Sequence, residues 1–361
     1  MTSTGTPRAD RWRDRRVFVT GHTGFVGGWL CAWLARLGAR VHGFALAPPT
    51  NPNFFEATRL AGQLASGTLG DIRDGEALGR ALREADPQVV FHLAAQPLVR
   101  AAHRDPVETF STNVMGTVAV LEACRSFRGI ETIVAFTTDK VYRNDASGRA
   151  FEEADRLGGN EPYSASKAGS DWAIATYAAS YFRGKPAVAT VRAGNIVGGG
   201  DWGADRLLPD AVRAFARREP LVIRNPHATR PWQHVLDAVR GSLLLAEHAG
   251  GDFGADDIAW NLGPSPEGES TVAQVADLAA RAWSDGASWR HGSDASIPES
   301  KTLRLSSAKA AERLGWRCAW GVERAVEESV AWYKAFASGA DVRALTQSQI
   351  DAYAREVEGL R

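Results

Sequence analysis

Short apolar segments alternate, along the N-terminal half of the chain, with longer segments in which apolar positions recur every three or four residues. The short segments are rich in valine, isoleucine and phenylalanine, a composition typical of buried parallel strands. We expect strands at residues 17–20, 39–46, 68–70, 89–93, 132–136 and 187–196. The longer segments have the spacing of helices that bury one face. Strands and helices in alternation predict an α/β fold with a doubly wound parallel sheet.

Three glycines, Gly21, Gly24 and Gly27, follow the first strand at a spacing of three residues, and a helical segment begins after them. A strand, a glycine turn and a helix in this order predict a dinucleotide site of the Rossmann type. Gly21 would form the tight turn, Gly24 would let the backbone approach a pyrophosphate, and Gly27 would let helix and strand pack closely. The helix N-terminus would offer N–H groups and positive potential to the phosphates. A tight turn without any ligand is the alternative.

The adenosine end of this site is less determined. The second strand ends in Ala45 and Leu46, without the carboxylate that often binds the adenosine ribose. No arginine follows closely enough to bind a 2′-phosphate, so the segment leaves NADP open while NAD is favoured. Asp71, at the end of the third strand, would bind an adenine amino group or act only as a turn and N-cap residue.

Polar residues gather where the fourth and fifth strands end, at the edge where parallel α/β sheets bind ligands. Ala94, Ala95 and Gln96 follow the fourth strand, and Thr137, Thr138, Asp139 and Lys140 follow the fifth. The small residues would let backbone approach a cofactor, and the polar cluster is where chemistry is expected. His92, inside the fourth strand, is expected to be a hydrogen-bonded core residue.

Tyr163 and Lys167 open a helix after a polar, glycine-rich loop over residues 142–160. Residues four apart share one face of a helix. A nearby ammonium lowers the pKa of a phenol and so suits tyrosine to act as a base. The pair is common by chance, and its weight comes from its place after the fifth strand.

A helix is also expected from Asp105 to about Ser126. Its apolar face would carry Val107, Phe110, Val114, Val118 and Leu121. Asn113 interrupts that helix, and a buried asparagine needs partners. It would either steady backbone or water near the site or fill a local polar gap.

The pattern changes beyond residue 198. Nine of the twelve tryptophans lie after residue 170, and residues 198–203 are expected to form a flexible glycine-rich loop. We expect a flexible leader over 1–14, and a dinucleotide-binding domain over 15–198 to which 231–260 returns. Residues 199–230 and 261–361 would form a smaller α/β lobe that binds the substrate. Its expected helices begin near Leu208 and lie near 271–284, 306–314, 321–336 and 346–356.

Arg224, Arg230, Trp232 and His234 cluster within twelve residues of this second part. Arginine is suited to bidentate phosphate contacts, and aromatic faces stack on bases or sugars. The cluster therefore predicts contacts with a phosphorylated substrate. A solvated loop with one buried tryptophan is the alternative.

Composition limits the possible partners. Acidic and basic residues balance at 42 each, so no bulk charge favours nucleic acid or a membrane surface. No apolar run approaches membrane-spanning length, and the arginine-rich N-terminus lacks the pattern of a secretory signal. The three cysteines are widely spaced and fit reduced residues of a cytoplasmic protein better than disulfides or metal ligands.

Taken together, the motifs resemble the extended short-chain dehydrogenase/reductase superfamily, and within it the CDP-glucose 4,6-dehydratases. The resemblance runs from Val17 to about Trp332. Its distinctive segments are residues 91–100, 111–117, 138–140, 192–202 and 224–235. Related dehydratases of dTDP-sugars carry Asp-Glu where this chain has Asp139-Lys140. The loop between Tyr142 and Tyr163 looks shorter than in the family.

The resemblance implies an NAD-dependent enzyme that converts CDP-glucose to its 4-keto-6-deoxy product. Implied catalytic residues are Thr138, Asp139, Lys140, Tyr163 and Lys167. Implied NAD contacts are Gly21, Thr23, Gly24, Phe25, Val26, Gly27, Asp71, Ile72, Leu93, Ala94, Ala95, Tyr163 and Lys167. Implied substrate contacts are Gln96, Asn195, Asp201, Trp202, Arg206, Arg224, Arg230 and His234. No metal is implied, and relatives associate through the helices near 105–126 and 163–182, so a homodimer or homotetramer is expected.

In the implied mechanism, Tyr163 removes the sugar 4-hydroxyl proton with the help of Lys167, and C4 hydride passes to NAD⁺. Lys140 then removes the C5 proton, Asp139 protonates the leaving 6-hydroxyl, and hydride returns to C6. Two alternatives stay open. One is an epimerase or reductase of the same superfamily, which would not need Asp139 and Lys140. The other is a non-catalytic NAD-sensing protein on the same fold.

Overall fold

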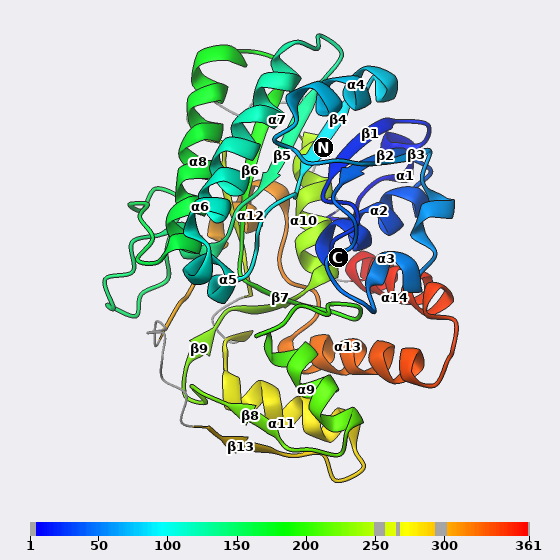
Figure 1. Cartoon of the computed structure of the whole chain (residues 1–361), viewed down its shortest axis with the longest axis vertical. Coiled ribbons are helices and arrows are strands. Elements are labelled where there is room, and N and C mark those ends of the chain that lie inside the picture. The colour runs from blue at the N-terminus through cyan, green and yellow to red at the C-terminus, as the bar shows by residue number, and fades with distance from the viewer. Residues whose placement is uncertain (1–4, 249–256, 265–267, 293–301, 360–361) are drawn as a thin grey trace.

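The computed structural model describes residues 5–248, 257–264, 268–292 and 302–359, and a seven-stranded parallel sheet forms its centre (Figure 1). The strands are β1 (Arg16–Thr20), β2 (Arg40–Ala45), β3 (Ser66–Leu69), β4 (Val89–His92), β5 (Thr132–Phe136), β6 (Ala187–Ala193) and β11 (Ala259–Leu262). Their order is β11-β6-β5-β4-β1-β2-β3. The direction of winding reverses between β1 and β4, which confirms the predicted doubly wound sheet and marks the usual ligand position.

The side chains of successive residues in each strand point to opposite faces of the sheet. Val17 and Val19 of β1 join a core with helices on one face, whereas Phe18 joins the core on the other. The first face is covered by α2 (Phe25–Arg36) and α10 (Val235–His248). The second is covered by α4 (Gly75–Ala85), α7 (Gly116–Arg125) and α8 (Pro162–Tyr181). Both faces are buried, which explains why the strand segments are apolar throughout.

The helix expected over 105–126 is built in three parts. Asp105 caps α6 (Pro106–Phe110), a π-helical turn η2 (Ser111–Met115) follows, and α7 completes it. The turn contains Asn113, so the predicted interruption is confirmed. The expected apolar face is partly wrong, since Val107 is 79% exposed and Phe110 is 40% exposed while Leu121 is buried.

A smaller lobe lies at one end of the sheet (Figure 1). Its core is formed mainly by α9 (Leu207–Ala216), α11 (Val272–Trp283) and α13 (Val322–Ala337). Three short strand pairs complete it: β7 (Asn195–Val197) with β10 (Trp232–His234), β9 (Thr229–Arg230) with β12 (Ser270–Thr271), and β8 (Leu221–Ile223) with β13 (Trp289–His291). Five further short helices precede this lobe in the chain: α1 (Ala9–Trp12), α3 (Phe54–Ala57), η1 (Leu60–Gln63), α5 (Val99–Arg104) and η3 (Asp139–Val141).

The chain returns to the sheet twice after this lobe begins. The first return comprises α10 and β11, so it extends to Leu262 rather than ending at residue 260; residues 249–256 within it lie outside the described residues. The second comprises α12 (Ala308–Leu314) and α14 (Val342–Gly359), whose buried residues Leu314 and Tyr353 join the core beside α2 and α10. We expected both of these helices in the second lobe. A helix can bury its apolar stripe against any open face, so sequence position alone could not assign them.

The expected flexible leader is wrong for residues 5–14, while residues 1–4 lie outside the described part of the chain. Trp12 of α1 is fully buried, and its indole donates to Glu247 at 2.5 Å. The backbone N–H of Arg8 donates to the same carboxylate at 2.8 Å. A buried aromatic ring with a satisfied N–H holds this segment against α10.

The glycine-rich segment 198–203 is not a flexible loop. The indole of Trp29 donates to Gly199 O at 2.9 Å, and the hydroxyl of Tyr333 donates to Asp201 O at 2.5 Å. A Cβ at Gly199 would lie 2.1 Å from the ring of Trp332. The glycines are therefore needed for close packing against α13, and the segment is a fixed support.

Candidate active site

The glycine turn lies between β1 and α2, as predicted. Gly21 has φ +79°, and a Cβ there would lie 2.7 Å from the backbone nitrogen of Ala94. A Cβ at Gly27 would lie 2.2 Å from Gly21 O, whereas one at Gly24 would meet only Gly21 O, at 3.3 Å. Gly24 is the N-cap of α2 and makes no side-chain cap hydrogen bond. The fold itself requires Gly21 and Gly27, while the uncapped helix start beside Gly24 suits an anionic ligand.

The other predicted NAD contacts adjoin this turn through the strand order β4-β1-β2-β3. Phe25 and Val26 begin α2, and Leu93, Ala94 and Ala95 follow β4. The N–H groups of Leu93 and Ala94 each approach the hydroxyl of Thr20 at 3.2 Å, and the hydroxyl of Thr23 donates to Leu46 O at 2.8 Å. These bonds fix the backbone around the turn.

Asp71 and Ile72 follow β3 at the far side of the same edge. Ile72 is buried, and Asp71 forms an ion pair with Arg73 at 2.6 Å. The hydrogen bond from Arg73 lowers the pKa of Asp71 below its ordinary value. Asp71 is therefore an ionised acceptor in a turn, a state compatible with either of its two predicted roles.

The turn after β5 brings together three of the predicted catalytic residues. The hydroxyl of Thr138 donates to Asp139 Oδ1 at 2.8 Å, and Lys140 Nζ donates to the same oxygen at 3.1 Å. Lys140 also donates to Asn195 Oδ1 at 3.3 Å. Asp139 is fully buried, and its Oδ2 has no hydrogen-bond partner among the described atoms. A cation, a carboxyl group and a hydroxyl thus meet within one short turn.

Tyr163 and Lys167 lie on α8 beside this turn and are both buried. Glu161 caps the helix, with its side chain accepting from the N–H groups of Tyr163 and Ser164. Lys167 Nζ donates to Phe136 O at 2.9 Å, which ties the helix to the end of β5. The predicted pair is therefore held in one place by backbone contacts.

Burial sets the protonation of both groups. It lowers the pKa of Lys167 to about 8, against the opposing charge of Asp171. It raises the pKa of Tyr163 to about 12, although a hydrogen bond with Thr138 and the charge of Arg206 act in the other direction. The expected lowering of the pKa of Tyr163 is thus wrong for this structure, because desolvation outweighs the nearby cations.

Asn113 connects three elements. Its Oδ1 accepts from Gln96 N at 2.8 Å, and its Nδ2 donates to Gln96 O at 3.1 Å and to Ser166 Oγ at 2.9 Å. Of its two predicted roles, support of the backbone therefore holds. The side chain of Gln96 donates to Thr109 of α6 and accepts from Leu98 N, so both of its polar atoms have partners within the protein.

The second lobe contributes Arg206 to the same edge, and it also carries Arg224 and Arg230. Arg206 pairs with Asp201 at 2.8 Å and lies near enough to influence the pKa of Tyr163. Arg230, in β9, is buried, and its Nη1 donates to Thr229 O at 2.9 Å. Arg224 approaches Asp205 at 3.4 Å.

Two predicted substrate contacts are not brought to this edge. His234 is fully buried between Trp29 and Trp320, and burial lowers its pKa to about 3. Trp202 packs against Tyr333 and Phe336 with ring centroids 5.1 Å and 5.3 Å away. Both side chains join the aromatic core, as large rings commonly do.

His92 behaves as predicted, with its two ring nitrogens bonded to Thr20 at 2.8 Å and Thr117 at 3.0 Å. Asp171 and Arg192 were not among the predicted residues; they form a buried ion pair that contacts the end of β5 through Thr137. Two signals pointed to them: Asp171 lies four residues after Lys167, and Arg192 stands within an apolar strand.

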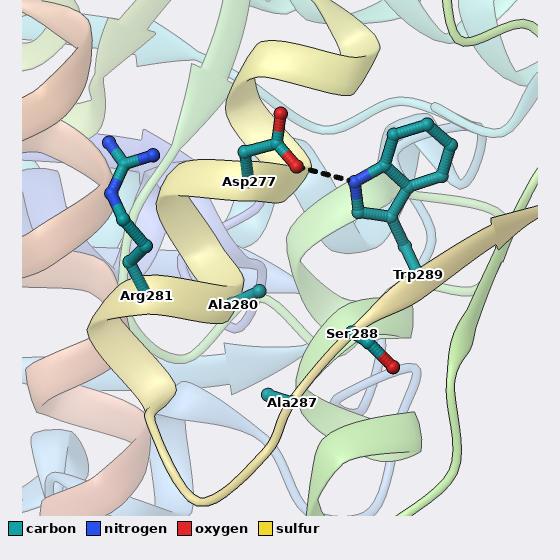
Figure 2. A pocket seen from close by; sticks show the side chains of 6 residues that line it. All are labelled: Asp277, Ala280, Arg281, Ala287, Ser288 and Trp289. Carbon is teal, nitrogen blue, oxygen red and sulfur yellow. Dashed lines mark hydrogen bonds between the residues drawn. The ribbon is translucent and has the colours of Figure 1, made fainter.

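A shallow hollow elsewhere carries none of these residues. It lies between α11 and β13 and is lined by Asp277, Ala280, Arg281, Ala287, Ser288 and Trp289 (Figure 2). The indole of Trp289 donates to Asp277 at 2.7 Å. Within the described ranges, no group of three or more His, Cys, Asp and Glu side chains could hold a metal ion, and every helix falls short of what a membrane crossing requires.

Residues 17–263 match the sequence model of the NAD dependent epimerase/dehydratase family. The chain belongs to this family. It is also 41% identical over 350 residues to a CDP-glucose 4,6-dehydratase of Salmonella typhimurium, covering 95% of this chain and 97% of the relative. Membership of the family makes the protein an NAD-dependent enzyme, consistent with the glycine turn at its predicted place.

Solved structures of the epimerase/dehydratase family share the fold. Epimerase Mth375 of Methanothermobacter thermautotrophicus superposes with a TM-score of 0.81 at 23% identity, covering 94% of this chain and 98% of that one. A dTDP-glucose 4,6-dehydratase of Bacillus anthracis in complex with NAD superposes with a TM-score of 0.74 at 22% identity, covering 92% of this chain and 99% of that one.

Proposed function

We propose that this protein is a CDP-glucose 4,6-dehydratase, which removes water from the sugar to form CDP-4-keto-6-deoxyglucose. The observation that carries the proposal is the turn Thr138-Asp139-Lys140, packed beside Tyr163 and Lys167. Exchange of configuration at C4 needs only the tyrosine–lysine pair. A buried carboxyl group and an amine in addition are what elimination across C5 and C6 needs. The choice of CDP-glucose rests on the Salmonella relative.

The residues around the glycine turn fit NAD. The uncapped start of α2 would hold the pyrophosphate, and the fixed backbone after β4 would face the nicotinamide end. When bound, NAD⁺ would supply the acceptor for the hydride of C4 and the source of the hydride that reaches C6. The protein supplies position and proton transfer.

Tyr163 would accept the proton of the sugar 4-hydroxyl as C4 becomes a ketone, while Thr138 donates a hydrogen bond to the 4-oxygen. A phenol with a pKa of about 12 is a poor base until cations favour its phenolate. Arg206 and Lys167 supply positive charge on this side. We expect closure of the site over the substrate to exclude water, which would strengthen the attraction between these two cations and the phenolate of Tyr163.

Elimination would follow from the acidity of the hydrogen beside the new ketone. Lys140 in its neutral form would take the C5 proton, and protonated Asp139 would give a proton to the departing 6-hydroxyl, which leaves as water. As hydride returns to C6, the ammonium of Lys140 would give a proton to C5. The proton that Tyr163 took from the 4-hydroxyl would pass through Thr138 to Asp139, so that all three groups regain their starting states. Asn195, bonded to Lys140, would orient the amine toward the sugar.

Arg206, Arg224 and Arg230 would bind the diphosphate, since guanidinium groups match phosphate oxygens. We propose that residues 15–198 with 231–260 hold the dinucleotide, and that 199–230 and parts of 261–361 hold the substrate. Gln96, His234 and Trp202 would support the site rather than contact the sugar.

The decisive experiment uses Lys140→Ala with CDP-glucose in deuterated water. The variant should still oxidise C4, seen as bound NADH absorbing in the near ultraviolet, and should fail to exchange the C5 hydrogen. Lys185→Ala, at an exposed lysine, is the control and should form product normally. A 6-deoxy product carrying solvent deuterium at C5 from the Lys140 variant would show that another group is the base.

We also propose a homo-oligomer formed through α6, η2 and α8. Val107, Met115 and Trp172 on these elements are 79%, 58% and 57% exposed, and Val107 and Met115 line an apolar hollow with Phe110. Exposed apolar side chains gathered in this way mark an interface. Sedimentation of the wild type should give at least a dimer, and Val107→Asp should reduce it to a monomer.

A cytoplasmic location is proposed from the three unpaired thiols.

A further inference from the structure

A buried ion pair lies next to the segment Thr138–Lys140, here called the catalytic turn. Arg192 of β6 donates to Asp171 of α8 through two bonds, Nη2 to Oδ1 at 2.7 Å and Nε to Oδ2 at 2.9 Å. The two side chains are 5% and 3% exposed. Buried charges are costly to keep, so such a pair needs a reason.

Asp171 connects the pair to the catalytic groups by two routes. Its Oδ2 accepts from the hydroxyl of Thr137 at 3.0 Å, and Thr137 directly precedes the catalytic turn. Asp171 also lies one helical turn after Lys167, whose Nζ is bound to Phe136 O at 2.9 Å. The carboxylate thus touches the end of β5 and faces the amine that is fixed to the same end.

The remaining donor of Arg192 is held away from the site. Its Nη1 donates to the hydroxyl of Tyr142 and to Glu153 O, both at 2.9 Å. The hydroxyl of Tyr142 in turn donates to Asn261 Oδ1 at 2.6 Å. Arg192 is therefore locked by β11 and by the loop after η3, and it cannot follow movements of the substrate.

Charged and titratable groups face Lys167 and Tyr163 from each element packed around them. They are Asp171 on α8, Glu161 at the N-cap of α8, His92 on β4, Asp139 on η3 and Arg206 before α9; Lys140 is bound to Asp139 and Arg192 to Asp171. Burial lowers the pKa of His92 to about 3, so it stays neutral and adds no charge. Asp171 is the carboxylate that acts on Lys167 most directly, and Arg192 is the cation bound to it.

We propose that Asp171 and Arg192 form a positioning pair for the reaction: Asp171 fixes the end of β5 through Thr137, and Arg192 binds Asp171 and offsets its negative charge next to the tyrosine–lysine pair. Neither residue touches the substrate. The assignment of Tyr163 as the base rests on the proposed function, whereas the effect on its titration does not.

The test compares two single variants and their combination. Asp171→Asn removes a negative charge, so the pKa of Tyr163 should fall and the acid limb of the kcat profile should move to lower pH. Arg192→Gln leaves Asp171 uncompensated, so the same limb should move to higher pH. The double variant should bring the limb back toward the wild-type position. Asp155→Asn breaks the surface pair with Arg149 and should leave the limb where it is.

A merely structural role predicts something different, namely loss of stability in both single variants with an unmoved limb. That result, or shifts of both variants in the same direction, overturns the proposal. Tyrosinate absorbance titrated with pH, in the presence and absence of Tyr163→Phe, gives the same comparison without turnover. If CDP-glucose proves not to be a substrate, this titration still decides the proposal.

Thr137 provides a second test if Arg192→Gln does not fold. Thr137→Val removes only the hydroxyl that binds Asp171, and should lower kcat about tenfold while KM stays within twofold, by the cost of one lost hydrogen bond. Thr137→Ser restores the hydroxyl and should recover the rate. Equal kcat values for the Val and Ser variants would contradict the link from Asp171 to the catalytic turn.

Discussion

The two halves of the sheet's carboxyl edge are built from different materials. The half after β1 and β3 consists of glycines, small side chains and backbone N–H groups, and its ion pair, Asp71 with Arg73, is about one third exposed. The half after β5 and β6 contains Asp139, Lys167 and the Asp171–Arg192 pair, all buried. The first half provides close backbone packing and the N-terminus of α2, whereas the second contains buried charged side chains.

This difference agrees with the role that we propose for each half. A dinucleotide phosphate can be bound by backbone groups that the fold leaves uncapped, at little cost to the protein. Proton transfer needs groups whose pKa values differ from those in water, and burial is the means of shifting them. We therefore expect substitutions in the first half to change binding, and substitutions in the second half to change rate and pH dependence.

The largest expected effect is that of Tyr163→Phe. It keeps the buried ring and removes only the hydroxyl, so activity should fall by roughly 10²- to 10⁴-fold, the range for loss of a general base. NAD binding, measured by fluorescence titration, should be unchanged. A variant with near-normal turnover would contradict both the role of Tyr163 and the contrast between the two halves.

Gly24→Val should act on binding alone. A branched side chain at the start of α2 would occupy the proposed pyrophosphate path, while the protein itself leaves room for it apart from one contact at 3.3 Å. NAD affinity should fall at least about 100-fold, the scale of lost phosphate contacts, with little change in melting temperature. Gly62→Val, where no atom lies within 4 Å, is the matched control. Unchanged affinity would place the pyrophosphate elsewhere.

Arg230→Ala asks whether the second lobe holds the nucleotide end of the substrate. Loss of a charge-assisted bond, worth about 1.5–3 kcal/mol, should raise KM roughly 10- to 150-fold. The exposed Arg217→Ala serves as the control and should leave KM within twofold. Wild-type kcat and KM in the Arg230 variant would remove this residue from the site.

The smallest expected effect concerns stability and pH. Lys167 has a folded pKa of about 8, below its ordinary 10.5, so the unfolded chain binds more protons between these values. Stability should therefore rise as the pH increases from about 8 to 10.5, by on the order of 3 kcal/mol from this group. Lys167→Met should flatten the rise in melting temperature.

Lys309, whose pKa burial also lowers to about 8, should maintain part of the slope. Lys309→Met alone should therefore flatten the curve by a smaller or similar amount, and the double variant should flatten it most. An unchanged slope in the Lys167 variant would mean that its ammonium is not desolvated in the folded protein.

The sequence by itself predicted the sheet, the glycine turn and the groups that we propose to be catalytic. These features are local: strand burial shows as unbroken apolar runs, the turn as glycines at a fixed spacing, and Tyr163 with Lys167 as a pair one helical turn apart. Such local patterns are enough to predict the place of the site, because the carboxyl ends of all the parallel strands lie at one edge of the sheet.

Only the tertiary structure decided which charges meet and which segments are held. Residues 8–12 are anchored by Glu247 and the glycine-rich segment 198–203 by Trp332, residues far away in sequence. His234 and Trp202 look like ligand contacts in the sequence, yet His234 is buried between two tryptophans and partly buried Trp202 packs against rings of α13. The pKa of Tyr163 rises rather than falls because desolvation depends on every atom packed around it, a sum that no local motif encodes.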